Sequence, residues 1–312
     1  MDMVFGTINS FGKVFAVLAL PMLVQSSIVI GLLLLAERLL RKKVRAVFRY
    51  WLGILILVQL ILPPSQFLRV SLGHLLGGRI GYISESAQMA SLRALNFGQV
   101  TSTTLITWQG VVFLVWLTIA GVMGAVLLKR AILARRLVRQ ARKANLLMND
   151  LLVYCCKCMG VDGRKVQLKI SDEGTSPAVY GLFRPVILVP RNLAPSLGSR
   201  HLRAVLLHEL AHIKRGDLWV NWAQTILQII YFYNPVLWFA NKMICKVREQ
   251  AVDETVLSVM GEKVQRYPEM LADVARLVFK RPALSLGLMG VVESKDALTK
   301  RIIRRTRGKI AN

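Results

Sequence analysis

The stretch LLHELAHIKRGD, residues 206–217, is the most informative part of the sequence for the fold. Apolar residues recur in and before it at spacings of three and four, which predicts an amphipathic helix ending near Gly216. On such a helix His208 and His212 lie one turn apart on one face. Their imidazoles can bind one zinc ion, and the carboxylate of Glu209 can then take a proton from a water on the metal. The alternative is an ordinary amphipathic helix that carries these residues by chance.

A catalytic zinc site needs a third protein ligand and an open position. The downstream stretch KVREQAVDETVL carries Glu249 and Asp253 four residues apart, hence on one helical face. We predict that Glu249 is the third ligand and that Asp253 accepts a hydrogen bond from a ligating imidazole, which fixes its tautomer. A solvated acidic face is the alternative. H-E-x-x-H together with E-x-x-x-D thus predicts one Zn2+ per chain.

The 24 uncharged residues at 218–241 conflict with this site if they form one straight helix. Such a helix would rise about 36 Å and would place Glu249 across a membrane from His208. Asn234-Pro235 offers a break in the middle of the segment, and a polar stripe at helical spacing disfavours a helix surrounded by lipid. We therefore predict an apolar helical hairpin that returns to one side and covers the zinc core.

The composition is typical of a membrane protein. Hydrophobic residues make up 54% of the 312 residues, yet Lys and Arg outnumber Asp and Glu by 42 to 17. Direct nucleic-acid binding is disfavoured, because the basic residues cluster beside apolar runs and no DNA-reading motif is present. The four cysteines, at 155, 156, 158 and 245, lack zinc-finger spacing and a disulfide framework, and we interpret them as small buried or lipid-proximal thiols.

Three apolar runs are long enough to span a bilayer, and they define a transmembrane domain over 1–128. The predicted spans cover about 14–36, 50–68 and 105–128, with an exterior loop at 69–104.

Charge sets the direction of these spans. Six basic residues follow the first run and seven lie between Lys129 and Lys143, whereas 69–104 holds three. The positive-inside rule then predicts an exterior N-terminus and a cytoplasmic chain after Leu128. We predict a basic juxtamembrane helix at 129–148 near anionic lipid headgroups, with a solvated helix face as the alternative. The protease domain follows at 149–312.

The start of this domain contains two segments whose sequences are typical of β-strands. VQLKIS and PVILVP are predicted strands, and the two prolines that bracket the second favour an edge position. An edge strand can bind an extended peptide through its backbone groups. A hairpin that only covers the helices is the alternative.

Taken together, these motifs resemble the BlaR/MecR-type antirepressor metallopeptidases, bacterial membrane zinc peptidases of the gluzincin group. The segments that carry the resemblance are SPAVYGLFRPVILVP, LLHELAHIKRGDLWVN, YNPVLWF, REQAVDETVL and KDALTKRIIRR. The resemblance implies a mainly α membrane protein with an α+β gluzincin-like zinc protease domain that contains a small sheet with an edge strand.

For the site, the resemblance implies zinc on His208, His212 and Glu249, with Glu209 as general base and acid. It also implies a substrate strand near Ser176, Pro177 and Gly181. Family members sense envelope stress and cleave a cytoplasmic repressor, which places the chain in the bacterial inner membrane as a multi-pass protein.

The chain departs from the β-lactam receptors of this family in one respect. Those receptors carry a further span and an exterior penicillin-binding sensor after the protease, whereas this sequence stops at Asn312 with no S-x-x-K motif after its protease motifs. Either it is a fragment, or the signal arrives through the loop at 64–104 or through a partner. A homodimer is left open.

The sequence does not assign the group that stabilises the transition state. Candidates are Tyr180, His201 and Arg301, and a structural or surface role is the alternative for His201. Two functions remain. One is a membrane-embedded zinc endopeptidase that cleaves a repressor-like protein, with the chain itself as a second candidate substrate, and the other is a non-catalytic membrane receptor or scaffold with structural zinc.

Overall fold

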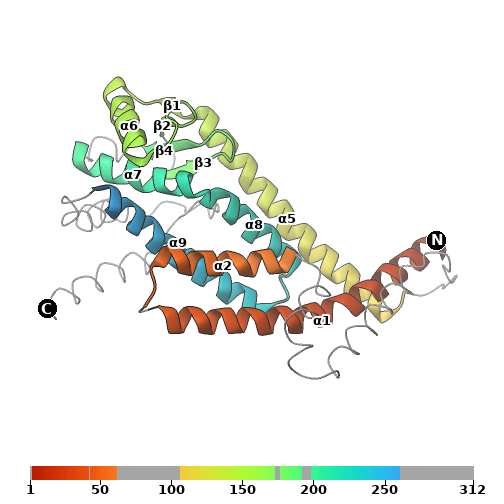
Figure 1. The fold of residues 1–312 in the computed structure, drawn as a ribbon. Helices are drawn as coiled ribbons and strands as arrows, with labels where there is room; N and C mark the ends of the chain where they lie inside the picture. Colours follow the sequence, from red (N-terminus) through yellow and green to blue (C-terminus); the bar gives the residue numbers. More distant parts are fainter. Residues whose placement is uncertain (1, 42, 62–105, 173–175, 192–197, 261–312) are drawn as a thin grey trace. The chain divides into compact units, whose positions relative to one another are not determined.

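Figure 1 shows the computed structural model of the chain, which describes residues 2–41, 43–61, 106–172, 176–191 and 198–260. It divides into two compact units. Unit 1 comprises Met1–Val44, Trp51–Val126 and Gln224–Ile244, and unit 2 comprises Arg45–Tyr50, Leu127–Ala223 and Cys245–Asn312. The exterior loop predicted at 69–104 and the end of the span predicted at 50–68 lie outside the described residues.

The described part is mainly helical, with one small sheet, as the sequence predicts. The helices are α1 (Asp2–Leu40), α2 (Ala46–Ile61), α5 (Trp108–Gln140), α6 (Leu146–Met159), α7 (Ser199–Arg215), α8 (Asp217–Ile230) and α9 (Pro235–Met260). The strands are β1 (Arg142–Lys143), β2 (Gln167–Ser171), β3 (Ala178–Tyr180) and β4 (Val186–Pro190).

Two helices of the described part are long and apolar enough to cross a membrane. They are Met3–Leu40, which contains the span predicted at 14–36, and Trp108–Gln140, which includes residues 108–128 of the span predicted at 105–128. The helix at Ala46–Ile61 is also apolar but shorter. Length and composition therefore support a membrane protein.

The uncharged segment at 218–241 is broken where the sequence predicts. Helix α8 ends at Ile230 and α9 begins at Pro235. Between them the Asn234 side chain accepts hydrogen bonds from the backbone N–H of Val236 (2.9 Å) and Leu237 (3.4 Å), which caps α9. Residues up to Ala223 on α8 belong to unit 2, Gln224–Ile244 belong to unit 1, and the rest of α9 from Cys245 belongs to unit 2.

Part of the polar stripe on α8 finds partners on α9 within unit 1. Gln224 donates to the amide oxygen of Asn241 (3.2 Å), and Asn241 donates to that of Gln228 (2.9 Å). These bonds pair both polar atoms of the Asn241 amide, which would be costly to leave without partners in an apolar setting. Unit 1 is thus held by side-chain hydrogen bonds as well as by apolar contacts.

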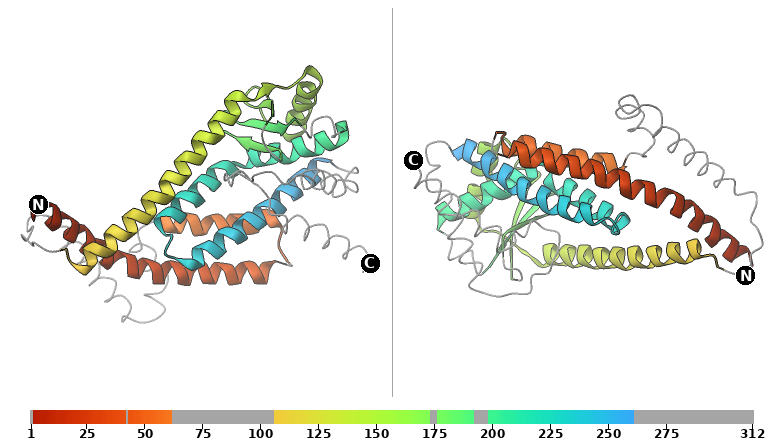
Figure 2. Two further views of the ribbon diagram at one scale, coloured as in Figure 1. Left: turned by 180° about the vertical axis from the view of Figure 1, so that it is seen from behind. Right: turned by 90° about the horizontal axis from the view of Figure 1, so that it is seen from below.

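The sheet of unit 2, drawn in shades of green in Figure 2, has the strand order β1-β2-β4-β3, and this order corrects the expectation that PVILVP lies at an edge. Strand β4 pairs parallel with β2 and antiparallel with β3, and all five of its residues are buried. The prolines do not interrupt it, because Pro185 precedes the strand and Pro190 is its last residue. The parallel pairing of β2 and β4 also excludes a simple hairpin.

Helices α6 and α7 pack on each other, and with the sheet and α9 they enclose the core of unit 2. The cysteines at 155 and 156 are buried in this core, and burial raises the pKa of the Cys155 thiol to about 12. The basic helix predicted at 129–148 is divided: α5 ends at Gln140, β1 pairs with β2, and Asn145 caps α6 by accepting from Met148 N–H (2.9 Å).

Candidate metal centre

Helix α7 carries the H-E-x-x-H motif and is amphipathic. Its apolar face, which includes Leu206 and Leu210, is fully buried in the core of unit 2. The helix ends where the sequence predicts, because Gly216 has φ +71° and its N–H bonds to the carbonyl oxygens of His212 and Ile213. This rigid helix fixes the two histidines of the motif relative to each other.

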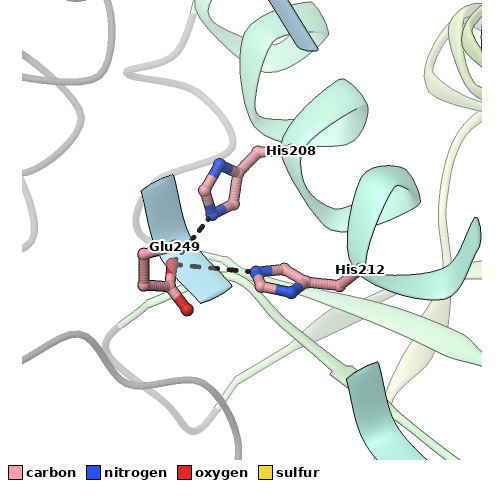
Figure 3. Close-up of side chains that lie close together, drawn as sticks. All are labelled: His208, His212 and Glu249. Carbon is pink, nitrogen blue, oxygen red and sulfur yellow. Dashed lines mark ion pairs between the residues drawn. The ribbon is translucent and has the colours of Figure 1, made fainter. Parts of the chain in front are cut away.

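The structure brings His208, His212 and Glu249 together (Figure 3). The carboxylate oxygen Oε2 of Glu249, from α9, lies 3.6 Å from Nε2 of His208 and 3.8 Å from Nε2 of His212, both from α7. One ligand atom of each residue lies within 4.8 Å of the others. Two segments far apart in sequence thus present three metal-binding groups to one point.

These three groups fit a zinc ion. Ligand atoms about 2 Å from a tetrahedral zinc lie about 3.3 Å from one another. The two distances from Oε2 of Glu249 to the imidazole nitrogens, 3.6 and 3.8 Å, exceed this value by a few tenths of an ångström. The Nε2 atom of His212 is buried and has no hydrogen-bond partner among the described residues, as expected of a nitrogen reserved for a metal. Two imidazoles and one carboxylate are also a donor set that zinc prefers.

The second nitrogen of each histidine faces a carboxylate. Nδ1 of His212 lies 2.8 Å from Oδ2 of Asp217, and Nδ1 of His208 lies 3.8 Å from Oδ1 of Asp253. When Nδ1 of each ring carries the proton, Nε2 keeps a lone pair. Both Nε2 atoms lie on the side of Glu249, so these lone pairs are available to a metal ion bound there. The short contact is the one made by Asp217, which is the first residue of α8 and is not among the site residues predicted from the sequence.

Charge and burial shift the pKa values of these groups. Burial would lower the pKa of His208, but the carboxylates around it, chiefly Glu249, outweigh burial and raise it to about 9. Burial would likewise raise the pKa of Glu249, but His212, His208 and Arg248 outweigh it and hold the pKa at about 2. Glu249 is therefore held as an anion, the form that binds a cation.

Glu209 lies next to this cluster and is 9% exposed. Burial raises its pKa, the two imidazoles oppose the rise, and the charge of Glu249 adds to it. A carboxylate with a raised pKa is a stronger base than one in water, which suits a group that accepts a proton at neutral pH.

Arg248 is a further charged group at this site, and it is not among the site residues predicted from the sequence. Its guanidinium is 3% exposed, lies 3.6 Å from Oε1 of Glu249 and donates to the side chain of Asn221 at 3.5 Å. It balances the negative charge of the buried carboxylates. Its position beside Glu249 in the motif is the only signal that the sequence offers.

Strand β3 lies against α7 at the edge of the sheet. Among the described residues one side of β3 pairs with β4 and no strand pairs with the other. Ser176 and Pro177 precede this strand and Gly181 follows it. Its last residue, Tyr180, has a pKa raised first by burial and then by the charge of Glu209, so its hydroxyl is within electrostatic reach of that carboxylate.

Of the other two candidates for transition-state stabilisation, His201 is the one that lies among the described residues. His201 lies in the first turn of α7, seven residues before His208, which is about 10 Å along the helix axis. Arg301 lies outside the described residues.

Comparison with known proteins identifies the family of the chain. Residues 17–304 match the family described as "BlaR1 peptidase M56". The chain is 26% identical over 268 residues to "Regulatory protein BlaR1" of Bacillus licheniformis, a match that covers 78% of this chain and 43% of that protein. It is 23% identical over 273 residues to "Methicillin resistance mecR1 protein" of Staphylococcus aureus, covering 80% and 44%. The chain thus matches less than half the length of these relatives.

Proposed function

The chain belongs to the BlaR1 peptidase M56 family, and from this premise we propose that it is a membrane-embedded zinc endopeptidase that relays an envelope or antibiotic-type signal. Its proposed substrate is a cytoplasmic protein, in the first place a transcriptional repressor, and the chain itself is a second candidate substrate. The observation that carries the proposal is the convergence of His208, His212 and Glu249 on one point.

In this proposal the two histidines and Glu249 hold the zinc ion. Bound zinc supplies a Lewis acid that lowers the pKa of water toward neutrality and polarises a peptide carbonyl. Glu209 accepts the proton of the attacking water and delivers it to the leaving amine, so that it acts first as base and then as acid. Its burial and raised pKa support this role.

The free side of β3 binds the substrate in this scheme. An extended peptide adds to the strand through backbone hydrogen bonds, with Ser176, Pro177 and Gly181 at its two ends. Tyr180, whose pKa senses the charge of Glu209, is the described residue best placed to donate a hydrogen bond to the carbonyl oxygen as negative charge develops. The packing of β3 on α7 supports a peptide path beside the metal ligands.

The distribution of charge supports an exterior N-terminus and a cytoplasmic protease domain. The basic residues from Lys129 to Arg139 belong to the last part of α5, whose first part is apolar. Basic residues at the end of an apolar helix are typical of the cytoplasmic side, where they meet anionic lipid headgroups. A cytoplasmic domain has direct access to a repressor.

The test replaces Glu209 by Gln in the full chain and measures metal content and cleavage. We expect zinc at one per chain in both proteins, and a loss of cleavage of about 100-fold or more, since general base catalysis contributes roughly 10²–10⁴-fold. Cleavage is followed by mass spectrometry of a co-expressed repressor-like protein and of the chain itself. Asp162→Asn makes the same chemical change at an exposed loop of unit 2 and should cleave normally.

Unaltered signalling by the Glu209→Gln protein would favour a non-catalytic receptor with structural zinc. A wild-type protein that contains no zinc would refute the metal centre itself.

A further inference from the structure

The first turn of α2 belongs to unit 2, although the rest of this helix belongs to unit 1. Its backbone N–H at Ala46 donates to both carboxylate oxygens of Glu254, each at 3.0 Å. One turn further, the guanidinium of Arg49 donates to the side chain of Gln250 at 3.4 Å. Both acceptors lie on α9, one and five residues after Glu249, so the start of α2 is attached to the helix that carries this ligand.

The same turn of α2 reaches the other side of the metal centre through Tyr50. The hydroxyl of Tyr50 donates to Oδ1 of Asp217 at 2.8 Å, and Oδ2 of the same carboxylate lies 2.8 Å from Nδ1 of His212. Tyr50, Asp217 and His212 are 2%, 0% and 1% exposed. A continuous buried chain of hydrogen bonds therefore joins α2 to His212.

Arg215 contacts both Tyr50 and Asp217 in this chain of hydrogen bonds. Its guanidinium carbon lies 4.7 Å from the centre of the Tyr50 ring, and its Nε lies 3.6 Å from Oδ2 of Asp217. The cation balances the charge of the buried carboxylate and holds the ring in place by a cation–π contact. The Tyr50 side chain is thus fixed by its ring and by its hydroxyl.

A buried carboxylate that bonds two groups has its orientation set by both of them. If the Tyr50 hydroxyl is absent, Oδ1 of Asp217 loses its short hydrogen bond, and the carboxylate can turn away from His212. The imidazole then loses the partner that fixes its tautomer and ring plane. Displacing the first turn of α2 would have the same effect as removing the hydroxyl.

We propose that Tyr50 is a positioning residue for His212, acting through Asp217, and that the first turn of α2 thereby couples an apolar helix to the metal centre. This inference rests on the proposed role of His212 as a metal ligand. The helix that bears Tyr50 continues as a largely apolar segment to Ile61. Because Tyr50 is part of this helix, a shift of α2 along its axis would move the Tyr50 hydroxyl directly.

The experiment compares the full-length Tyr50→Phe protein with wild type in detergent, with zinc affinity measured by competition against a chromophoric chelator. Phe keeps the ring under Arg215 and removes only the hydroxyl. We expect zinc affinity to fall about tenfold, the low end of the loss that accompanies changes in groups that orient metal ligands. Tyr231→Phe is the matched control, since Tyr231 donates one buried hydrogen bond to the carbonyl of Leu60 and does not contact Asp217.

A double-mutant cycle separates positioning from simple packing. If Tyr50 acts through Asp217, Tyr50→Phe should change zinc affinity little in a chain that already carries Asp217→Asn. Additive losses in the double variant, or wild-type zinc affinity in Tyr50→Phe alone, would overturn the inference. Wild-type protein that binds no zinc would overturn the proposed metal centre as well, so the two failures are distinguishable.

The unfolding midpoint of each zinc-free variant provides the control for stability. Tyr50→Phe and Tyr231→Phe each remove one buried hydroxyl bond and should lower this midpoint by similar amounts, while only Tyr50→Phe weakens zinc binding. Equal loss of zinc affinity in both variants would assign the effect to general destabilisation and would overturn the positioning role.

Discussion

Oε2 of Glu249 lies 3.6 Å from Nε2 of His208, although the whole uncharged segment at 218–241 separates the two residues in sequence. A straight helix over this segment would hold them tens of ångströms apart. They meet because the chain turns back between Ile230 and Pro235. The short distance makes Glu249 the residue on which the metal centre can be tested most directly.

Replacing Glu249 by Gln should remove zinc binding. The amide has nearly the same shape but carries no charge and is a poor zinc ligand. We expect a loss of zinc affinity larger than the roughly 10–100-fold that follows changes in groups behind the ligands. Zinc content after dialysis against a weak chelator, measured by atomic emission, checks this outcome.

Asp150→Asn is the control for that change, since Asp150 is exposed on α6 and should keep full zinc content. Full zinc occupancy in Glu249→Gln would remove Glu249 from the ligand set.

Features set by neighbouring residues could be predicted from the sequence. The spacing of Leu206, Leu210 and the two histidines predicts α7, and Gly216 ends it because glycine adopts positive φ without strain. The break at Pro235 follows from the missing N–H of proline. The family resemblance, carried by several such segments, is confirmed by the match over 17–304.

Features set by residues distant in sequence could not be predicted. Asp217 is the first residue of α8, and its distance in sequence from Tyr50 gives no sign that the Tyr50 hydroxyl bonds to its Oδ1. Strand β4 lies inside the sheet because its prolines fall outside the paired interior, whereas the mere presence of proline predicts an edge. Strand β3, with three residues, is too short for a periodic pattern.

Replacing Arg248 by Met should destabilise the zinc-free protein by about 3 kcal/mol, because the carboxylate of Glu249 then stays buried without its guanidinium neighbour. Bound zinc supplies positive charge at the same place, so the loss should be smaller when zinc is present. Thermal unfolding of the variant and of wild type, each with and without zinc, gives the four midpoints that are needed.

Arg191→Met offers a contrast, because Arg191 pairs with Asp172 at 3.1 Å on the surface, where 64% of its side chain is exposed. Such a pair contributes about 0–1 kcal/mol. Equal destabilisation of the Arg248→Met protein with and without zinc would show that Arg248 does not balance charge at the metal centre.

Replacing Gly181 by Ala should distort the end of β3. Gly181 has φ +90°, and an added Cβ would lie 2.5 Å from the backbone oxygen of Arg184, which cannot move without shifting the connection to β4. We expect a stability loss of about 1–3 kcal/mol and weaker peptide binding, seen as a higher KM for a peptide substrate. Gly163→Ala, where the nearest atom to the new Cβ is 3.6 Å away, should change neither quantity. A lower unfolding midpoint with an unchanged KM would show that β3 does not bind the peptide substrate.

Reporter fusions at three positions test the direction of the chain in the membrane. Six basic residues lie between Arg38 and Arg49 and seven between Lys129 and Lys143, against three in 69–104. The positive-inside rule therefore predicts that green fluorescent protein fused after residue 44 or after residue 145 is fluorescent, and that alkaline phosphatase fused after residue 85 is active. Each site receives both reporters, so that every fusion has its opposite as a control. Active phosphatase after residue 145 would place the metal centre outside the cell, where no cytoplasmic repressor could reach it.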